Sequence, residues 1–416
     1  MLQRIYGRIR IEISHYKNLS QNVRLILLSY SFFLMAYPLV ATFINAFLWR
    51  NSSSLWTIIT YQAGHIIALP LGFYVNGLLL KKIHVKHLYF TGTVLQGLTA
   101  VLVVFFSDNT AANIFSFGIL YGLGGGIYWA NKNYLSLQMT KNSNRVYYNS
   151  MEQTIDFIIN IIIPAMAGWF LVFVGNSHLF DFSIAYKILM FTAFILLFLS
   201  GLTIQRSKID DVKIADLTIK KPSSDWQLVR LYNFIYNIGI GLSIAVSSVL
   251  VLVLVGGEGV LGMLQTITTL ISALVAYIVG RENKVSIYWK LVAAGSLIFL
   301  AGSLILAGVF TWVGGLIYTI VVTLVWTIQW SPSYTIEMEI MDKEESDPEK
   351  QYAYVCDNEL FFNIGRAAGI AVVVILTLLF NDHFALRYSP LIIAFLQLPM
   401  AFLIRILANK ITVGNN

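Results

Sequence analysis

The sequence predicts an all-α integral membrane protein with twelve transmembrane helices, arranged as two pseudo-symmetric six-helix bundles. The chain has 416 residues, of which 57% are hydrophobic and only 12% are charged, whereas soluble domains are about half apolar and a quarter charged. Twelve long apolar runs follow one another, and one polar stretch divides them into six and six. Such continuous runs favour helices, because the strands of a membrane barrel would alternate polar and apolar residues.

Each predicted span is long enough to cross the hydrocarbon core as a helix, which satisfies its own backbone hydrogen bonds in lipid. In order, the spans are 23–48, 56–80, 86–106, 111–138, 147–174, 183–204, 228–255, 259–280, 287–309, 312–338, 352–380 and 386–408. The chain therefore divides into an N-terminal segment (1–22), a first bundle (23–204), a linker (205–227) and a second bundle with a short tail (228–416).

Positive charge is distributed unevenly between the two sides of the predicted membrane. With the N-terminus inside, Arg50, Lys187 and Arg387 are the only ones of the 28 Lys and Arg residues that fall outside, while Lys132 and Arg366 lie within spans. This pattern predicts a multi-pass protein of the cytoplasmic membrane with both termini in the cytoplasm. It also explains the net charge of +7 without a nucleic-acid partner.

The N-terminal segment, 1–22, has apolar residues at helical spacing with Arg and Lys between them. This pattern predicts a short amphipathic helix on the inner surface of the lipid bilayer. A frayed basic tail is the alternative.

The two halves carry a related pattern at the loops that follow spans four and ten. Glu152 and Asp156 stand at the same offset from Glu359 and Asn363, and each loop follows a stretch rich in aromatic and amide residues. Parallel half-repeats about an axis along the membrane normal are typical of one transporter fold. A chance similarity is the alternative, because the matching stretches are short.

Six plus six spans, the central linker and the predicted cytoplasmic termini together resemble the major facilitator superfamily over nearly the whole chain. The stretch 77–86 is similar to the family motif between spans two and three, although Lys81 stands where the family has Asp. The stretch 43–49 and the Gly-rich span four, ending in Tyr128 and Trp129, resemble the YqgE-type putative transporters. The resemblance implies a transporter that works as a single chain, by alternating access.

Ionisable residues within spans are costly and mark candidate sites. Glu152 and Asp156 share one face of span five, because they are four residues apart, and Lys132 on span four lies at a similar depth. We expect a proton-binding carboxylate cluster here, with Lys132 as its charge partner or as an anion site. A fixed ion pair that holds the two spans together is the alternative. Glu359 on span eleven is a second candidate for proton coupling.

Arg366 lies well inside span eleven, close to the face that carries Glu359 and Asn363. A guanidinium near the membrane midplane predicts a fork for a carboxylate or phosphate group of a substrate. An internal salt bridge is the alternative. Lys132 adds a second positive charge, so we expect a solute with an anionic group.

Aromatic and amide side chains on several spans predict walls suited to flat or hydroxylated ligands. Interfacial anchoring is the alternative for the rings, and a hydrogen-bonded core position is the alternative for the histidine. The residues are Tyr128, Trp129, Asn131, His65, Asn233, Asn237, Gln265, Trp326, Gln329 and Trp330.

Two further patterns are better explained by structure than by chemistry. Gly122, Gly124, Gly125 and Gly126 crowd span four, which favours close helix packing rather than a phosphate-binding loop, since no strand precedes them. An acidic cluster at 337–349 lacks the ligand spacing of a calcium loop, so we expect a solvated loop there and no metal site.

These patterns together predict a secondary active transporter of a small organic solute that is driven by protons and needs no cofactor. An exporter of amphipathic drugs or lipids is the alternative within transport. A membrane-embedded enzyme is disfavoured because familiar catalytic motifs are missing, and a sensor is disfavoured because the chain has no enlarged soluble domain.

Overall fold

The computed structural model describes residues 16, 19–106, 110–139, 142–177, 180–209, 214, 216–281 and 285–414. The amphipathic helix expected at 1–22 falls largely outside these residues. Within them the chain is helical and contains no strand. The expected all-α fold is therefore confirmed.

Every predicted span corresponds to a helix or to two consecutive helices. The first six are α2 (Gln21–Ser52), α3 (Leu55–Leu79), α4 (Val85–Phe105), α5 (Ala111–Met139), α6 (Asn142–Ser177) and α7 (Phe182–Gln205). The second six are α8 (Ser224–Leu250) with the π-helical turn η1 (Val251–Val255), α9 (Glu258–Arg281), α10 (Val285–Gly308), α11 (Trp312–Glu344), α12 (Pro348–Leu379), and α13 (Asp382–Gln397) with α14 (Met400–Gly414).

Among the described residues, eleven segments are long and apolar enough to cross a membrane. Helix α5 is the predicted span that this measure leaves out. Its polar side chains Asn131, Lys132 and Asn133, with its glycines, lower its hydropathy. It nevertheless packs closely against α3 and α4, so its polarity points to a role inside the bundle.

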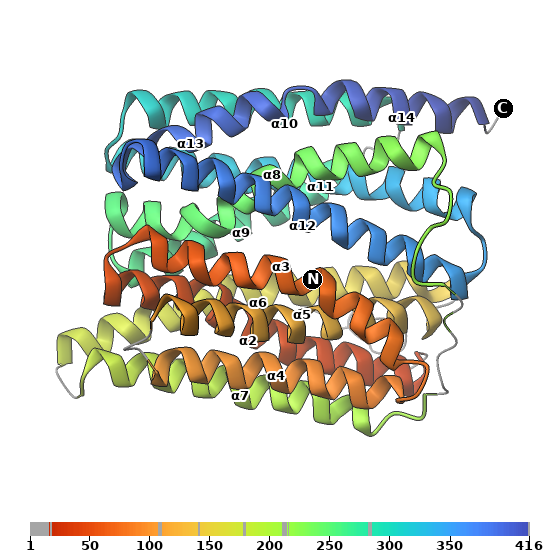
Figure 1. Ribbon diagram of the computed structural model, residues 1–416, viewed down its shortest axis with the longest axis horizontal. Coiled ribbons are helices and arrows are strands. Elements are labelled where there is room, and N and C mark those ends of the chain that lie inside the picture. The colour runs from red at the N-terminus through yellow and green to blue at the C-terminus, as the bar shows by residue number, and fades with distance from the viewer. Residues whose placement is uncertain are drawn as a thin grey trace, which may run out of the picture.

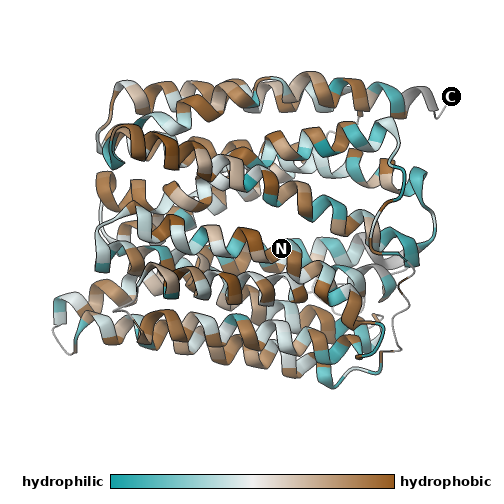
Figure 2. Cartoon of the chain, viewed as in Figure 1, coloured by the Kyte–Doolittle hydropathy of each residue, from teal (hydrophilic) through white to brown (hydrophobic). Residues whose placement is uncertain are grey.

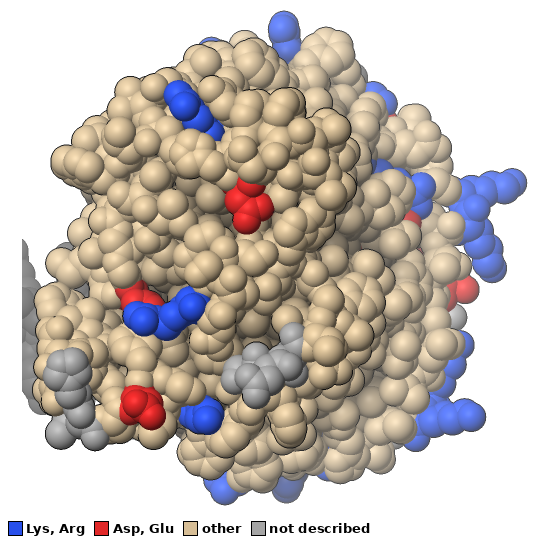
Figure 3. Space-filling model, turned by 60° about the vertical axis from the view of Figure 1, so that its left-hand side comes forward, with Lys and Arg blue, Asp and Glu red and all other residues tan. Residues whose placement is uncertain are grey.

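The helices run side by side, with α2–α7 in one group and α8–α14 in the other (Figure 1). The segment between α7 and α8 runs along the right-hand end of the view, which we call the linker face; the opposite end is the distal face. Apolar residues dominate the lengths of the helices, and hydrophilic residues gather towards the linker face (Figure 2). The distal face shows few charged side chains, while Lys and Arg gather along the edge that leads to the linker face (Figure 3).

Glycines bring α3 and α5 into backbone contact. A Cβ atom at Gly118 or Gly122 would clash with the backbone of α3 at Tyr61 and His65, and one at Gly126 would meet Leu69 and Gly72. Small residues of this kind allow helices to approach closely in membranes. The glycines of span four therefore serve helix packing, as expected, and they hold the α3 segment around His65 firmly in place.

The two helix groups contact each other towards both faces. Near the distal face, Arg50 of α2 pairs with Glu258 of α9 at 2.8 Å, and the Tyr186 hydroxyl donates to the same carboxylate at 3.0 Å. Near the linker face, the Tyr352 hydroxyl of α12 donates to the carbonyl of Phe73 at 2.9 Å and accepts from Asn76 at 3.1 Å. The middle of the molecule lies between these two sets of contacts.

Candidate functional site

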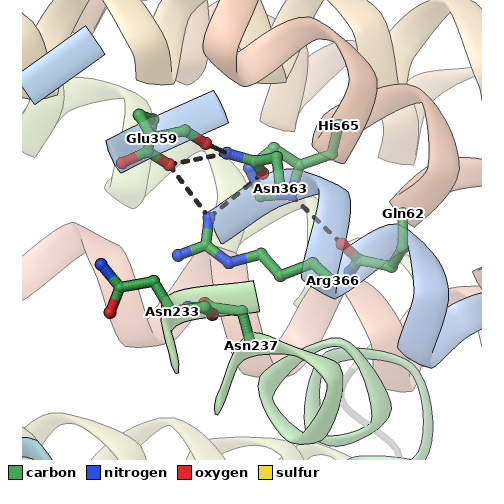
Figure 4. Close-up of polar contacts among 7 residues, drawn as sticks. All are labelled: Gln62, His65, Asn233, Asn237, Glu359, Asn363 and Arg366. Carbon is green, nitrogen blue, oxygen red and sulfur yellow. Dashed lines mark hydrogen bonds and ion pairs between the residues drawn. The ribbon is translucent and has the colours of Figure 1, made fainter. Parts of the chain in front are cut away.

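Arg366 lies near the middle of α12 and forms a cluster with residues one and two turns before it (Figure 4). Its Nη1 atom donates to Glu359 Oε1 and to Asn363 Oδ1, both at 3.2 Å. Asn363 Nδ2 also donates to the same Glu359 oxygen at 2.7 Å. The three side chains are therefore held together on one face of the helix, as their spacing predicted.

The guanidinium of Arg366 is only partly used. Arg50 and Arg230 each place Nε and Nη2 on the two oxygens of one carboxylate, Glu258 and Asp357 respectively. In Arg366, Nη1 makes the contacts, and Nε is buried without a partner among the described residues. Leaving a buried donor unpaired costs about 1–3 kcal/mol. The Nε–Nη2 edge of Arg366 is thus left without an acceptor among the described residues.

Close helix packing fixes the position of this arginine. A Cβ atom at Gly241 of α8 would collide with the backbone of Arg366 itself, and Gly365 and Gly369 of α12 approach the α8 carbonyls of Phe234 and Ile238. Backbone contact on this scale leaves little room for α8 and α12 to slide locally. The guanidinium consequently extends from a rigid base towards Asn233 and Asn237 of α8 (Figure 4).

Helices of the first group approach Arg366 as well. The charge of Arg366 acts on His65 of α3, whose Nδ1 lies 3.2 Å from Gln62 Oε1. The charges of Arg366 and Asp156 both act on the hydroxyl of Tyr37 in α2. Tyr37 is 41% exposed although it lies in the middle of a long helix. We infer that Tyr37 lines a space between the two helix groups, with Arg366 on one side and Asp156 on the other.

The second cluster lies on α5 and α6 and contains Lys132, Glu152 and Asp156. Lys132 Nζ pairs with Glu152 Oε2 at 2.9 Å, and the Tyr148 hydroxyl donates to the other oxygen of Glu152. Asp156 instead accepts from Asn160 of its own helix at 2.9 Å. The Lys132–Glu152 pair joins the two helices, as in the alternative of a fixed ion pair, and Asp156 takes no part in it. In the described part of the chain, no cation lies within salt-bridge distance of Asp156.

The aromatic residues divide into buried and exposed groups. Tyr128 is fully buried and stacks on Phe33 with ring centroids 3.8 Å apart, and Trp129 meets the same ring edge-on. Trp326 donates to Ser243 at 3.1 Å and is partly buried. Trp330 differs, because it is 46% exposed. Of the four predicted rings, Trp330 is therefore the most exposed.

Four of the predicted amides form hydrogen bonds within or between helices and none with Arg366. Asn131 exchanges two hydrogen bonds with Asn76 of α3, and Gln329 donates to Ser296 of α10 at 3.1 Å. Gln265 accepts from Thr42 of α2, and Asn237 donates to a carbonyl of its own helix. Asn131 and Gln329 are fully buried and bonded to neighbouring helices. A substrate-binding role for any of the four amides stays a prediction.

A third polar cluster was missed by the sequence analysis. Glu337, assigned to a solvated acidic loop, is 5% exposed, because α11 continues to Glu344 and carries it into the bundle. Asn233 donates to Glu337 Oε2 at 2.9 Å, and Asn358 donates to Oε1. The positions 329, 333 and 337 repeat at intervals of four, a helical signal that could have placed Glu337 on a buried face. Among the described residues, no group of three His, Cys, Asp or Glu gathers as it would around a metal ion.

Comparisons with known proteins agree with this architecture. A family model described as Major Facilitator Superfamily matches residues 25–347. The chain is 20% identical over 351 residues to an uncharacterised protein, YqgE, of Bacillus subtilis (strain 168), covering 84% of this chain and 81% of that one. It is 24% identical over 153 residues to an uncharacterised protein from the sodM 3′ region of Geobacillus stearothermophilus, covering 37% and 72% respectively.

Solved structures share the fold at low sequence identity. The crystal structure of the nucleoside transporter NupG superposes with a TM-score of 0.67 at 11% identity, covering 93% of this chain and 99% of that one. An inward-facing bacterial homologue of the human lysosomal transporter Spinster gives 0.66 at 9%, covering 94% and 96%. A D-xylose–proton symporter gives 0.66 at 11%, covering 92% and 96%. At these identities the likeness concerns the fold alone.

Proposed function

We propose, given that the chain belongs to the major facilitator superfamily, that this multi-pass membrane transporter carries a small organic solute with an anionic group. Transport proceeds by alternating access of the two helix groups and is coupled to protons. The unused Nε–Nη2 edge of Arg366 carries this proposal. A carboxylate or phosphate would complete on this edge the two-point contact that Arg50 and Arg230 already make with carboxylates of the chain.

Glu359 links anion binding to a proton. Its Oε1 atom holds Arg366 Nη1 at 3.2 Å, so an incoming anion and Glu359 share one guanidinium. Protonation of Glu359 would remove the competing negative charge, and the anion and the proton would then favour each other's binding. Asp156 is the other candidate for proton coupling, because it faces the same space through Tyr37 and has no ion-pair partner among the described residues.

The contacts between the helix groups supply the two gates that alternating access requires. The Arg50–Glu258 pair closes the distal side, and the contacts of Tyr352 with α3 close part of the linker side. We place the linker face in the cytoplasm, because Lys and Arg gather towards it. Each gate must open in turn, so the distal pair must break when the central space is reached from outside.

A thermal-shift screen of the purified protein against metabolites tests the binding step, because a ligand that binds the folded state raises its stability. We expect stabilisation by a family of carboxylates or phosphates, lost in Arg366→Ala and retained in Arg405→Ala. Arg405 is the matched control, because it is exposed and lies over Trp289 of α10. Equal stabilisation of both variants would contradict the role of Arg366.

An exporter of amphipathic compounds is the second candidate. The stacked rings of Trp330 and Tyr334, 46% and 44% exposed, offer a surface for apolar rings. This reading predicts that cationic or lipid-like amphiphiles stabilise the protein, and that Trp330→Ala reduces the effect more than Arg366→Ala does.

A further inference from the structure

Glu337 is a carboxylate enclosed by three helices. It lies on α11, seven residues before the end of that helix at Glu344, or about 10 Å inside that end at 1.5 Å per residue. Asn233 comes from α8 and Asn358 from α12, and both amides are buried with it. Asn233 Nδ2 also donates to Asn358 Oδ1 at 2.9 Å. The carboxylate and two carboxamides thus form one closed cluster.

The surroundings of Glu337 provide no counter-charge. From α12 it faces the carboxylate of Glu359, and from α8 the hydroxyl of Tyr232, which is bonded to Ser333. Tyr334 lies three residues before it on the same helix. Other cations contact other groups: Arg230 contacts Asp357, Arg366 contacts Glu359 through Nη1, and Lys290 and Arg405 contact the ring of Trp289. In the described part of the chain, no Lys, Arg or His lies within salt-bridge distance of Glu337.

A buried carboxylate without a cation is expensive to keep ionised, and such groups tend to bind a proton instead. The two carboxamides suit both states. Each carries a donor and an acceptor at the same end, so half a turn of Asn358 replaces an N–H that bonds the ionised carboxylate with an oxygen that accepts the proton of the neutral acid. This rotation gives up the hydrogen bond that Asn358 Oδ1 accepts from Asn233 and gains one from the neutral acid, so the cluster can accommodate either state of the carboxyl group.

We propose that Glu337 is a proton-binding site of the transport cycle. This inference rests on the proposed function and adds a carrier that is separate from Asp156 and Glu359. Asn358 and Glu359 are consecutive on α12, so a movement of α12 that accompanies ligand binding at Arg366 also moves a partner of Glu337. The proton binds while α8, α11 and α12 enclose the carboxyl group and leaves when their separation admits water.

Infrared pH titration of the purified protein in lipid, with no substrate present, measures this proton directly. Protonated carboxyl groups have a C=O stretch that ionised ones lack. Between about pH 5 and about pH 9, wild type should show such a band that decreases with rising pH. The band component should vanish in Glu337→Gln and remain in Glu339→Gln, the same substitution two residues away on the same helix.

An unchanged band in Glu337→Gln would overturn the inference, because the carboxyl group would then be ionised throughout. If the band is lost in Glu337→Gln but the wild-type protein transports no solute, proton binding at Glu337 stands and the proposed function is rejected. Sodium-dependent stabilisation that disappears in Glu337→Gln, without a protonated band, would replace the proton by a metal cation.

A second variant serves if Glu337→Gln fails to fold. Asn358→Leu removes an N–H donor that stabilises the ionised carboxylate, so the neutral acid should persist to higher pH. The decrease of the band should shift upward by about one pH unit, which corresponds to one hydrogen bond of about 1.4 kcal/mol. An unshifted titration would contradict the assignment to Glu337.

Discussion

Each helix group contains a glutamate paired with a cation, but the two pairs differ in geometry. On α5 and α6, Lys132 and Glu152 come from different helices and the lysine amine also lies 4.5 Å from the centre of the Tyr30 ring. On α12, Arg366 and Glu359 belong to one helix. The first pair ties two helices together, whereas the second leaves half of a guanidinium facing the space between the groups. We infer that the first is chiefly structural and the second binds ligand.

A similar contrast separates the two candidate carboxylates of α6. Glu152 shares its oxygens between Lys132 and Tyr148, while Asp156, one turn away, has Asn160 of its own helix. Glu359 and Asn363 repeat this carboxylate–amide arrangement on α12. Corresponding positions of the two halves can therefore have different roles. The position of the nearest cation decides which carboxylate is neutralised.

We expect the largest effect from breaking the Lys132–Glu152 pair. Lys132→Ala leaves Glu152, whose side chain is only 14% exposed, without its cation, which should cost about 3–5 kcal/mol of stability. Thermal unfolding in detergent measures the loss. Adding Glu152→Gln should restore most of it, because no unpaired charge then remains. If the single variant unfolds at the wild-type temperature, the pair does not stabilise the bundle.

Arg366→Lys sharpens the comparison, because it keeps the charge but removes the fork. We expect the affinity for the anionic ligand to fall about 30-fold, or about 2 kcal/mol, with little change in stability. Titration calorimetry gives the number. A lysine variant that binds as tightly as wild type would mean that charge alone, without two-point geometry, holds the anion.

Asp156→Asn tests the group that has no cation partner. Because no ion pair is broken, the free energy of unfolding should change by no more than about 0.5 kcal/mol. The dependence of ligand affinity on pH should weaken between about pH 5 and about pH 8, since one titrating group has been removed. Unaltered pH dependence would restrict Asp156 to its contact with Asn160.

Much of the fold could be predicted from the sequence, and less of the site could. Apolar runs of membrane length identify helices without any tertiary information, so the spans agree with the observed helices to within a few residues. Spacing on one helix also predicted the Glu359–Asn363–Arg366 cluster. These inferences depend on local geometry alone, which the order of residues determines directly.

Contacts between helices could not be predicted in the same way. Glu152 and Asp156 lie one turn apart on α6, and that difference decides which of them Lys132 reaches. Glu337 looked solvated because it begins a run of acidic residues, yet α11 extends to Glu344 and buries it. Rotation and end point of a helix depend on packing with its neighbours, which a single sequence leaves undetermined.

Uptake into proteoliposomes tests the central claim most directly. The anionic ligand that stabilises the protein would be supplied outside the liposomes, with a proton gradient directed inward as the only driving force. Wild type should accumulate the ligand, collapse of the gradient should stop accumulation, and Arg366→Ala should abolish it. Ligand accumulation that is equal with and without the gradient, or equal in wild type and Arg366→Ala, would contradict proton-coupled transport of an anion bound by Arg366.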